Sequence, residues 1–157
     1  MNVYIVSSAG GHLNETLSMA EAFDNCDVYI ITLGFPNMKD VSFPHFKGIY
    51  KMRLWFDYSI KFGLPITLFV SFFSILKIFL KHRPHIIFSA GSEIALPGFF
   101  LGKFLFRAKF IYMESLTRIK SLSLTGKIVY PFADLFLVQW PELAEQHEKA
   151  LYKGRLI

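Results

Sequence analysis

Cysteine is nearly absent from this sequence of 157 residues. The single Cys26 excludes a disulfide within the chain and leaves no cysteine pair for a metal site. The N-terminus also lacks a basic segment ahead of its first apolar run, which is only a few residues long, so we interpret that run as a strand and not as a signal peptide. We therefore predict a protein of the cell interior with no bound metal.

Common nucleotide-binding and nucleic-acid-binding patterns are missing as well. The glycines do not form the Gly-x-Gly-x-x-Gly fingerprint of dinucleotide sites, and no Walker motif is present. No helix carries a dense stripe of Lys and Arg, although the net charge is +5 and the pI is near 9.3. This basic balance favours phospholipid headgroups or a diphosphate as the anionic partner over nucleic acid.

Apolar and aromatic residues are, in contrast, abundant. Hydrophobic residues make up 53% of the chain, aromatics make up 17% with 18 Phe, and the mean hydropathy is +0.38. A chain of this length builds one domain, whose core does not hide so much apolar material. We therefore predict a single domain, 1–157, whose surplus apolar surface faces a membrane or a partner.

Short apolar runs alternate with helical patterns along the chain. This alternation is typical of a parallel sheet with helices on both faces. About six strands favour a Rossmann-like α/β fold, with a flavodoxin-like strand order as the alternative. Strands are predicted at 3–7, 27–33, 49–54, 85–89, 109–113 and 135–138, and helices at 13–23, 65–81, 94–106, 124–133 and 141–152.

The longest apolar stretch, FGLPITLFVSFFSILKIFL at 62–80, contains one charge. Its usable helix, 65–81, is about 25 Å long, which is short of the roughly 30 Å hydrocarbon core of a bilayer. Thr67, Ser71, Ser74, Lys77 and Lys81 fall on one helical face, which we expect to turn outward. We favour a helix lying in one leaflet, because a true span would separate strands of one sheet; an ordinary buried helix is the alternative. The predicted membrane residues are Pro65, Leu68, Phe69, Phe72, Phe73, Leu76, Phe79, Lys81 and Arg83.

Two loops rich in small residues follow predicted strands. The first contains Ser8, Gly10, Gly11 and His12, and the second contains Gly91, Ser92 and Glu93. Such loops bring backbone N–H groups close to a ligand, and in a Rossmann order the two would lie side by side as a cradle for a diphosphate. The alternative is that both are simply tight turns. His12 is a candidate base. Glu114 follows a later strand on the same side, and Arg118, four residues on, is expected to pair with Glu114 or to hold a phosphate of the diphosphate.

Motifs throughout the chain resemble the PssD family, which is similar to the eukaryotic asparagine-linked-glycosylation protein fourteen. They are SSAGGH, SAGSEIALPG, ESLTR, SLTGK, YPFADLFLVQWPE and the closing GRL. The resemblance covers nearly the whole chain and implies the acceptor-side half of a GT-B glycosyltransferase such as MurG. The half that binds the UDP-sugar would then be a separate, PssE-like catalytic chain, so no cofactor is expected here.

The resemblance also implies roles for particular residues. The protein would anchor its partner at the cytoplasmic face of the cell membrane and present a polyprenyl-diphosphate-linked sugar. Gly10, Gly11 and His12 would contact the acceptor diphosphate or assist deprotonation of the acceptor hydroxyl, and Gly91, Ser92 and Glu93 would form the second acceptor loop. The residues implied in partner docking are Trp140, Gly154, Arg155, Leu156 and Ile157.

One departure from the family concerns the membrane anchor. Eukaryotic members carry a membrane-spanning helix ahead of the first strand, whereas this sequence starts at the strand. We therefore expect attachment through 65–81 and a bacterial exopolysaccharide or capsule pathway. Two other functions remain open: a self-sufficient small glycosyltransferase with His12 and Glu114 as acid and base, and a soluble nucleotide-binding module.

Overall fold

A parallel sheet organises the protein. The computed structural model describes residues 1–8, 10–33, 45–52 and 63–156, and in this part of the chain seven strands pair in the order β3-β2-β1-β4-β5-β6-β7. The strands are β1 (Asn2–Ser7), β2 (Asp27–Leu33), β3 (Phe46–Met52), β4 (Ile86–Ala90), β5 (Lys109–Met113), β6 (Leu135–Val138) and β7 (Ala150–Tyr152). All neighbours are parallel. The Rossmann-like prediction is confirmed, because β1 lies beside β4 at the point where the strand order reverses.

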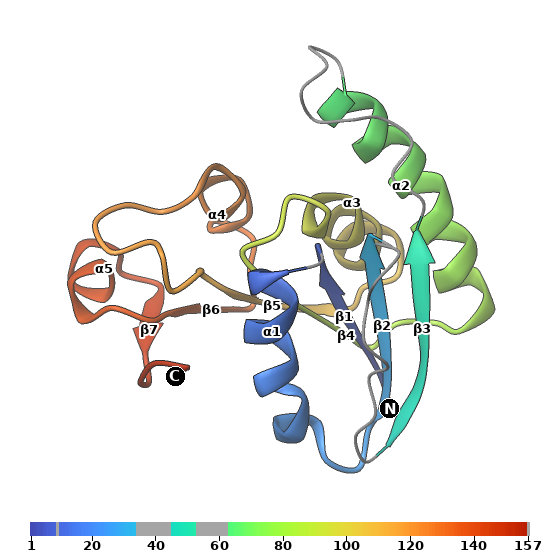
Figure 1. The fold of residues 1–157 in the computed structure, drawn as a ribbon, viewed down its shortest axis with the longest axis horizontal. Helices are drawn as coiled ribbons and strands as arrows, with labels where there is room; N and C mark the ends of the chain where they lie inside the picture. The colour runs from blue at the N-terminus through green and yellow to red at the C-terminus, as the bar shows by residue number, and fades with distance from the viewer. Residues whose placement is uncertain (9, 34–44, 53–62, 157) are drawn as a thin grey trace.

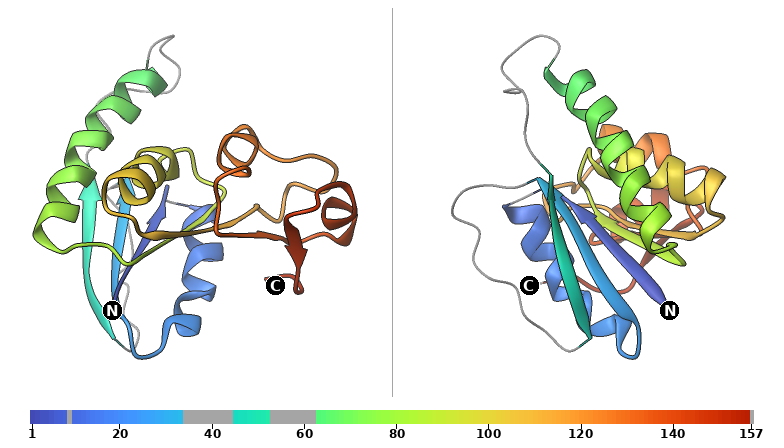
Figure 2. Two further views of the ribbon diagram at one scale, coloured as in Figure 1. Left: turned by 180° about the vertical axis from the view of Figure 1, so that it is seen from behind. Right: turned by 90° about the vertical axis from the view of Figure 1, so that its right-hand side faces the viewer.

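Helices cover both faces of this sheet (Figures 1 and 2). One face carries α1 (Gly11–Ser18) and the short 3₁₀ turn η1 (Ala20–Phe23). The other face carries α2 (Gly63–Lys81), α3 (Ala95–Phe100) with its π-helical continuation η2 (Leu101–Leu105), and α4 (Leu124–Val129), while α5 (Pro141–Gln146) packs beside β7. Two hydrophobic cores result, one on each side of the sheet.

The strand sequences follow from this layering. β1 and β4 are buried almost throughout, because helices cover both of their faces, and they are correspondingly apolar. At the edge, β3 carries the exposed Lys47 and Lys51 between apolar residues, a charge pattern that discourages pairing with a foreign strand. Lys47 also forms an ion pair with Asp27 of β2, with an N–O distance of 3.1 Å.

The C-terminal secondary structure differs from the prediction. The helix expected over 141–152 ends at Gln146, and Ala150–Tyr152 forms a seventh strand on β6. The backbone leaves the helix at His147, whose φ of −137° is extended. The predicted helix over 124–133 is likewise shorter and ends at Val129, whereas the helix over 94–106 is present with Pro97 in its first turn, where no N–H donor is needed.

Helix α2 faces the sheet with a different side from the one predicted. Its buried residues recur every four positions, at Gly63, Thr67, Ser71, Ile75 and Phe79. The predicted outward stripe is therefore wrong for its first two members, Thr67 and Ser71, which lie on the buried side of the helix with Ile75 and Phe79. Only the charged end of the stripe is exposed.

Phe79 is also a correction to the predicted membrane residues. Its side chain is fully buried and packs edge-on against Tyr4 of β1, with ring centroids 4.9 Å apart. It therefore fixes the C-terminal half of α2 to the sheet. The N-terminal turns of α2, by contrast, project beyond the carboxyl edge of the sheet (Figures 1 and 2).

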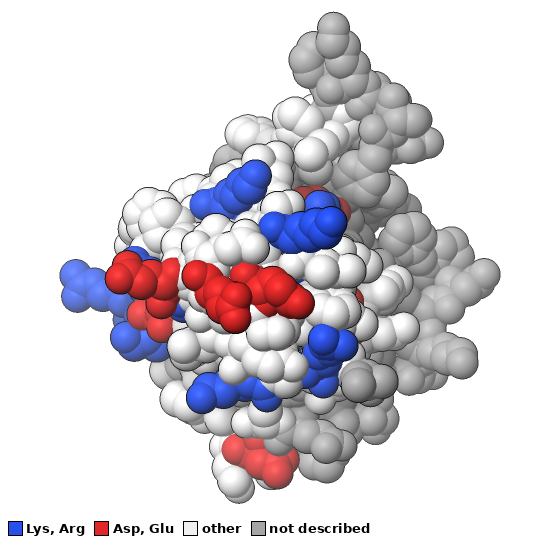
Figure 3. All heavy atoms as spheres, turned by 90° about the vertical axis from the view of Figure 1, so that its left-hand side faces the viewer, with Lys and Arg blue, Asp and Glu red and all other residues white. Residues whose placement is uncertain are grey.

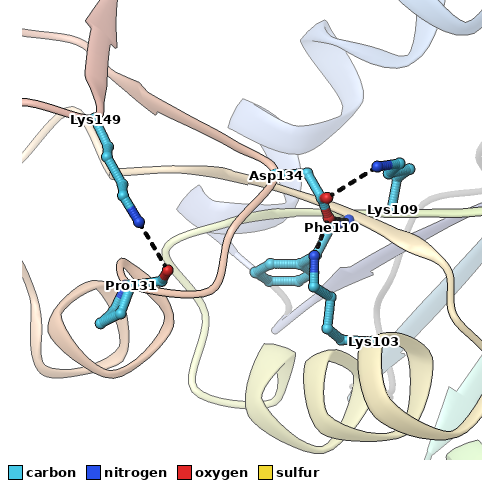
Figure 4. Close-up of polar contacts among 6 residues, drawn as sticks. All are labelled: Lys103, Lys109, Phe110, Pro131, Asp134 and Lys149. Atoms are coloured by element: carbon cyan, nitrogen blue, oxygen red, sulfur yellow. Dashed lines mark hydrogen bonds and ion pairs between the residues drawn. The ribbon is translucent and has the colours of Figure 1, made fainter.

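The carboxylate of Asp134 ties η2 to the sheet (Figure 4). Asp134 accepts from Lys103 Nζ at 2.6 Å, Lys109 Nζ at 3.2 Å and the Phe110 backbone N–H at 2.8 Å. Partial burial opposes its ionisation, but these donors outweigh burial and lower the pKa of Asp134. The contact holds the end of the π-helical segment against β5.

Candidate acceptor-binding site

The two small-residue loops meet at the carboxyl edge of the central strands. Ser8 follows β1 and Ser92 follows β4, and the Ser8 backbone N–H donates to Ser92 Oγ at 2.8 Å. Ser92 is fully buried, so its hydroxyl connects the loops rather than facing solvent. The predicted side-by-side arrangement of the loops is present.

The first loop presents a bare helix N-terminus. Gly10 caps α1 with a φ of 95°, a backbone conformation that favours glycine, and no side chain among the described residues caps the helix N-terminus. A Cβ added at Gly10 or Gly11 would meet no described atom within 4 Å. The described residues thus leave space beside the N–H donors at the positive end of a helix dipole, which is the geometry of an anion site.

His12 and Gly91 are in close contact across the two loops. Gly91 has a φ of 78°, and a Cβ there would lie 3.0 Å from His12 Cε1 and 3.1 Å from Ser115 Cβ. Only glycine fits between these two side chains without displacing one of them. His12 Nδ1 is buried and has no hydrogen-bond partner among the described residues.

A polar chain that the sequence analysis missed borders the same site. Ser115 Oγ donates to Glu15 Oε1 at 3.1 Å and lies 3.2 Å from Thr117 Oγ1. Glu15 stands one helical turn after His12 on α1, a spacing visible in the sequence. Its partner Ser115 follows β5, 100 residues away, so no local pattern could have paired them.

Glu114 lies beneath the site and not within it. Its carboxylate is fully buried and accepts from the backbone N–H of Ser115 at 3.2 Å and of Ser123 at 2.9 Å, and from Ser123 Oγ at 3.1 Å. A Cβ at Gly126 would overlap this carboxylate, so glycine is required there. Burial raises the pKa of Glu114, and the hydrogen bonds offset this only in part. A group so enclosed does not fit the predicted contact with substrate.

The remaining predicted loop residues lie around the rim. Arg118 is exposed, and its backbone N–H donates to the Ser115 carbonyl at 2.9 Å, closing the turn after β5. Glu93 is partly buried at the start of the segment that leads into α3. The structure therefore brings Ser8, Gly10, Gly11, His12, Gly91 and Ser92 together, with Arg118 exposed on the turn after β5.

The predicted docking residues that the structure describes form one contact group beside β6 and the edge strand β7. The Arg155 guanidinium lies 3.7 Å from the centroid of the Trp140 ring, and the Leu156 N–H donates to Gln139 Oε1 at 3.0 Å. Gly154 has a φ of 117°, and a cavity of about 150 Å³ lies between this tail, Met19 and Met113. Ile157 lies outside the described residues.

This contact group is hydrogen-bonded to the loop after β5. Trp140 Nε1 donates to the Leu116 carbonyl at 2.7 Å, and Gln139 Nε2 donates to the Glu114 carbonyl at 3.1 Å. The C-terminal tail is therefore connected by hydrogen bonds to the loop that carries Ser115.

Exposed apolar side chains gather on the face that carries α2, α3 and α4. On α2, the Phe69 side chain is 66% exposed and contacts Phe73 with ring centroids 5.1 Å apart. The sequence analysis identified this helix but missed its neighbours on the same face (Figure 2). They are Phe100, Phe104, Leu105, Leu124, Ile128 and Phe132. Pro65, Lys81 and Arg83 are exposed as predicted, whereas Leu68, Phe72 and Leu76 are half-buried.

Helix α2 also meets the length and composition of a membrane span, with a mean hydropathy of 2.0 over its most apolar window. Of that window, 28% is buried inside the protein, in keeping with the single buried ridge that runs along one side of the helix. Within the described ranges, no group of three His, Cys, Asp or Glu side chains is placed to bind a metal ion.

Comparison with known proteins identifies related sequences. The family described as "Oligosaccharide biosynthesis protein Alg14 like" matches residues 57–156. The UDP-N-acetylglucosamine transferase subunit alg14 of Schizosaccharomyces pombe is 30% identical over 181 residues, covering 98% of this chain and 82% of that protein. Subunit ALG14 of Yarrowia lipolytica is 44% identical over 97 residues, covering 59% of this chain and 45% of that protein.

A solved structure shares the fold. MurG of Acinetobacter baumannii superposes with a TM-score of 0.66 and 16% sequence identity, covering 90% of this chain and 42% of that chain. The matched part is thus less than half of MurG and of the Yarrowia protein.

Proposed function

The chain belongs to the Alg14-like family, and we propose that it is a subunit of a UDP-N-acetylglucosamine transferase that extends a lipid-linked sugar. The names of its relatives describe a transferase subunit, which supports a second chain as the catalytic, donor-binding partner. We identify that partner by role as a PssE-like protein, similar to asparagine-linked-glycosylation protein thirteen. This chain would bind the lipid-linked acceptor and present it to that partner.

The open glycine cradle at the N-terminus of α1 carries this proposal. Gly10 and Gly11 leave room for a ligand over unsatisfied N–H groups, and Ser92 ties the second loop to the first. An acceptor diphosphate would accept hydrogen bonds from these backbone donors, favoured by the helix dipole. His12, beside the cradle, would then take the proton of the acceptor hydroxyl as the donor sugar is transferred.

The exposed apolar face supports attachment to the membrane. Phe69 and Phe73 lie on α2, whose N-terminal turns project from the domain, and Lys77, Lys81 and Arg83 are exposed on or near the same helix. Apolar side chains would enter one leaflet while the cations interact with anionic headgroups, each contributing about 1 kcal/mol. We place this attachment on the cytoplasmic face, where a UDP-sugar is supplied.

The biosynthetic pathway is the most specific part of the proposal. The resemblance to PssD favours an exopolysaccharide or capsule, whereas the family description refers to oligosaccharide biosynthesis. A polyprenyl-diphosphate-linked acceptor serves both, so the chemistry proposed for the cradle is the same in either pathway.

Two substitutions in the cradle test the function. The complex of this chain with its catalytic partner would be assayed for transfer from UDP-N-acetylglucosamine to a lipid-linked acceptor. His12→Ala should lower the rate by about 10²–10⁴-fold, the usual contribution of a general base. Gly11→Ala should leave folding intact, because no described atom lies within 4 Å of the new Cβ, but should block the cradle and abolish transfer.

The control is His85→Ala, since His85 lies at the opposite end of the sheet, where its Nδ1 accepts from the Asn2 N–H. All variants should still co-purify with the partner. Wild-type activity in both cradle variants would contradict the acceptor role, and full activity without the partner would identify a self-sufficient enzyme instead.

A further inference from the structure

We propose that Glu15 binds a hydroxyl group of the sugar that the acceptor carries next to its diphosphate. The inference rests on the proposed function and adds a sugar-recognising subsite to the diphosphate cradle. It would make Glu15 a residue that distinguishes a sugar-bearing lipid diphosphate from the bare one.

The two carboxylate oxygens of Glu15 differ in their hydrogen bonds. Oε1 accepts from Ser115 Oγ at 3.1 Å, and Ser115 itself is only 4% exposed. Oε2 is buried and has no hydrogen-bond donor among the described residues. A buried carboxylate oxygen without a donor is costly, so a ligand that supplies one would be bound strongly.

The hydrogen-bond directions around Ser115 indicate that the Glu15 carboxylate accepts hydrogen bonds. Ser115 has one hydroxyl proton, which goes to Glu15, so Ser115 accepts from Thr117 Oγ1 at 3.2 Å. Thr117 therefore donates to Ser115, and Ser115 donates to Glu15 Oε1. A ligand that pairs with Glu15 Oε2 must likewise be a hydrogen-bond donor.

Charge and position identify that donor as a neutral hydroxyl. Glu15 lies one turn along α1 from His12, at the side of the cradle proposed for the diphosphate. Glu15 accepts a hydrogen bond from Ser115, and His12 lies beside Gly91. A carboxylate repels phosphate oxygens, so it cannot serve the diphosphate itself. Sugar hydroxyls adjoin the diphosphate in the acceptor and donate readily to carboxylates.

Two probes separate sugar recognition from diphosphate binding. Binding to the complex with the partner would be measured for a short-chain isoprenyl diphosphate and for its N-acetylglucosaminyl derivative. Glu15→Gln keeps the size of the side chain and removes its charge. It should weaken binding of the sugar-bearing probe by about 10- to 100-fold, the loss expected for one charge-assisted hydrogen bond. Binding of the bare diphosphate should be unchanged or tighter, because a nearby negative charge is lost.

Further variants define the other outcomes. Ser115→Ala, which removes the donor to Oε1, should also weaken binding of the sugar-bearing probe. Asp24→Asn, at an exposed position beyond α1, should change the binding of neither probe. If both probes bind the wild type but Glu15→Gln weakens them equally or not at all, the sugar subsite is wrong while the cradle stands. A changed pH profile of the transfer rate with unaltered acceptor affinity would instead assign Glu15 to orienting His12. If neither probe binds the wild type, the proposed function fails with it.

Discussion

At the scale of single residues, Glu114 shows how burial decides the role of a charged group. Its carboxylate receives three hydrogen bonds, from Ser115 and Ser123, yet desolvation outweighs them and raises its pKa. These bonds hold the turn after β5 and the start of α4 together, since Ser123 caps that helix by accepting from the Gly126 N–H. Glu114 therefore supports the loop that carries Ser115.

This burial predicts a pH dependence of stability. A carboxyl group whose pKa is higher in the folded state than its ordinary value near 4.3 binds more protons when folded, so its stabilising contribution is present at low pH and is lost as pH rises through the folded pKa. Relative to Glu114→Gln, the wild type should lose free energy of unfolding as pH rises from about 4 to neutrality. Urea unfolding of both proteins across this range measures the difference. Parallel pH curves would show that the pKa is not raised.

Residues of the site were predictable only where the signal is local. Gly10, Gly11 and Gly91 stand in short turns between a strand and a helical segment, and glycine there reflects a backbone requirement that sequence reveals. Glu15 was missed because its role depends on Ser115, which approaches only when β5 joins β4 in the sheet.

At the scale of secondary-structure elements, α2 divides into a buried face and an exposed face. Its buried ridge runs from Gly63 to Phe79, while Phe69 and Phe73 face outward. The sequence predicted the helix and its apolar excess. It did not predict which face is buried, because Thr67 and Ser71 are polar residue types, typical of an exposed face, and yet both are buried.

This division predicts opposite effects of substitutions on the two faces. Phe69→Asp with Phe73→Asp should release the protein from anionic vesicles in a sedimentation assay and leave its unfolding free energy nearly unchanged. Ile75→Ala should lower that free energy by about 2–5 kcal/mol and leave vesicle binding of the folded protein intact. If the double variant unfolds the protein instead, the outer face of α2 belongs to the core.

At the scale of the whole molecule, hydrogen bonds connect the C-terminal tail with the loop after β5. Leu156 bonds to Gln139, Gln139 bonds to Glu114, and Trp140 bonds to Leu116. The end of the molecule built by α5 and β7 carries both signs of charge, with acidic side chains in a band between basic ones (Figure 3). A mixed surface of this kind suits a specific protein partner better than a lipid surface.

Loss of the tail should therefore affect both the partner and the site. Deleting Gly154 to Ile157 should reduce capture of the catalytic partner, and Arg155→Ala should do so in part, because the guanidinium stacks on Trp140. Pull-down with the tagged partner measures this, with exposed Lys120→Ala on the loop after β5 as the control. Undiminished capture by the deletion variant would count against docking through the tail.

The sequence by itself determined the Rossmann-like class, the long helix and the two glycine loops, because apolar periodicity and backbone requirements act over a few neighbouring residues. The tertiary structure alone decided three other features: the seventh strand at Ala150–Tyr152, the face of α2 that is buried, and the pairing of Glu15 with Ser115. Each of these depends on contacts between segments far apart in the chain, whose free energy exists only once the sheet has assembled around them.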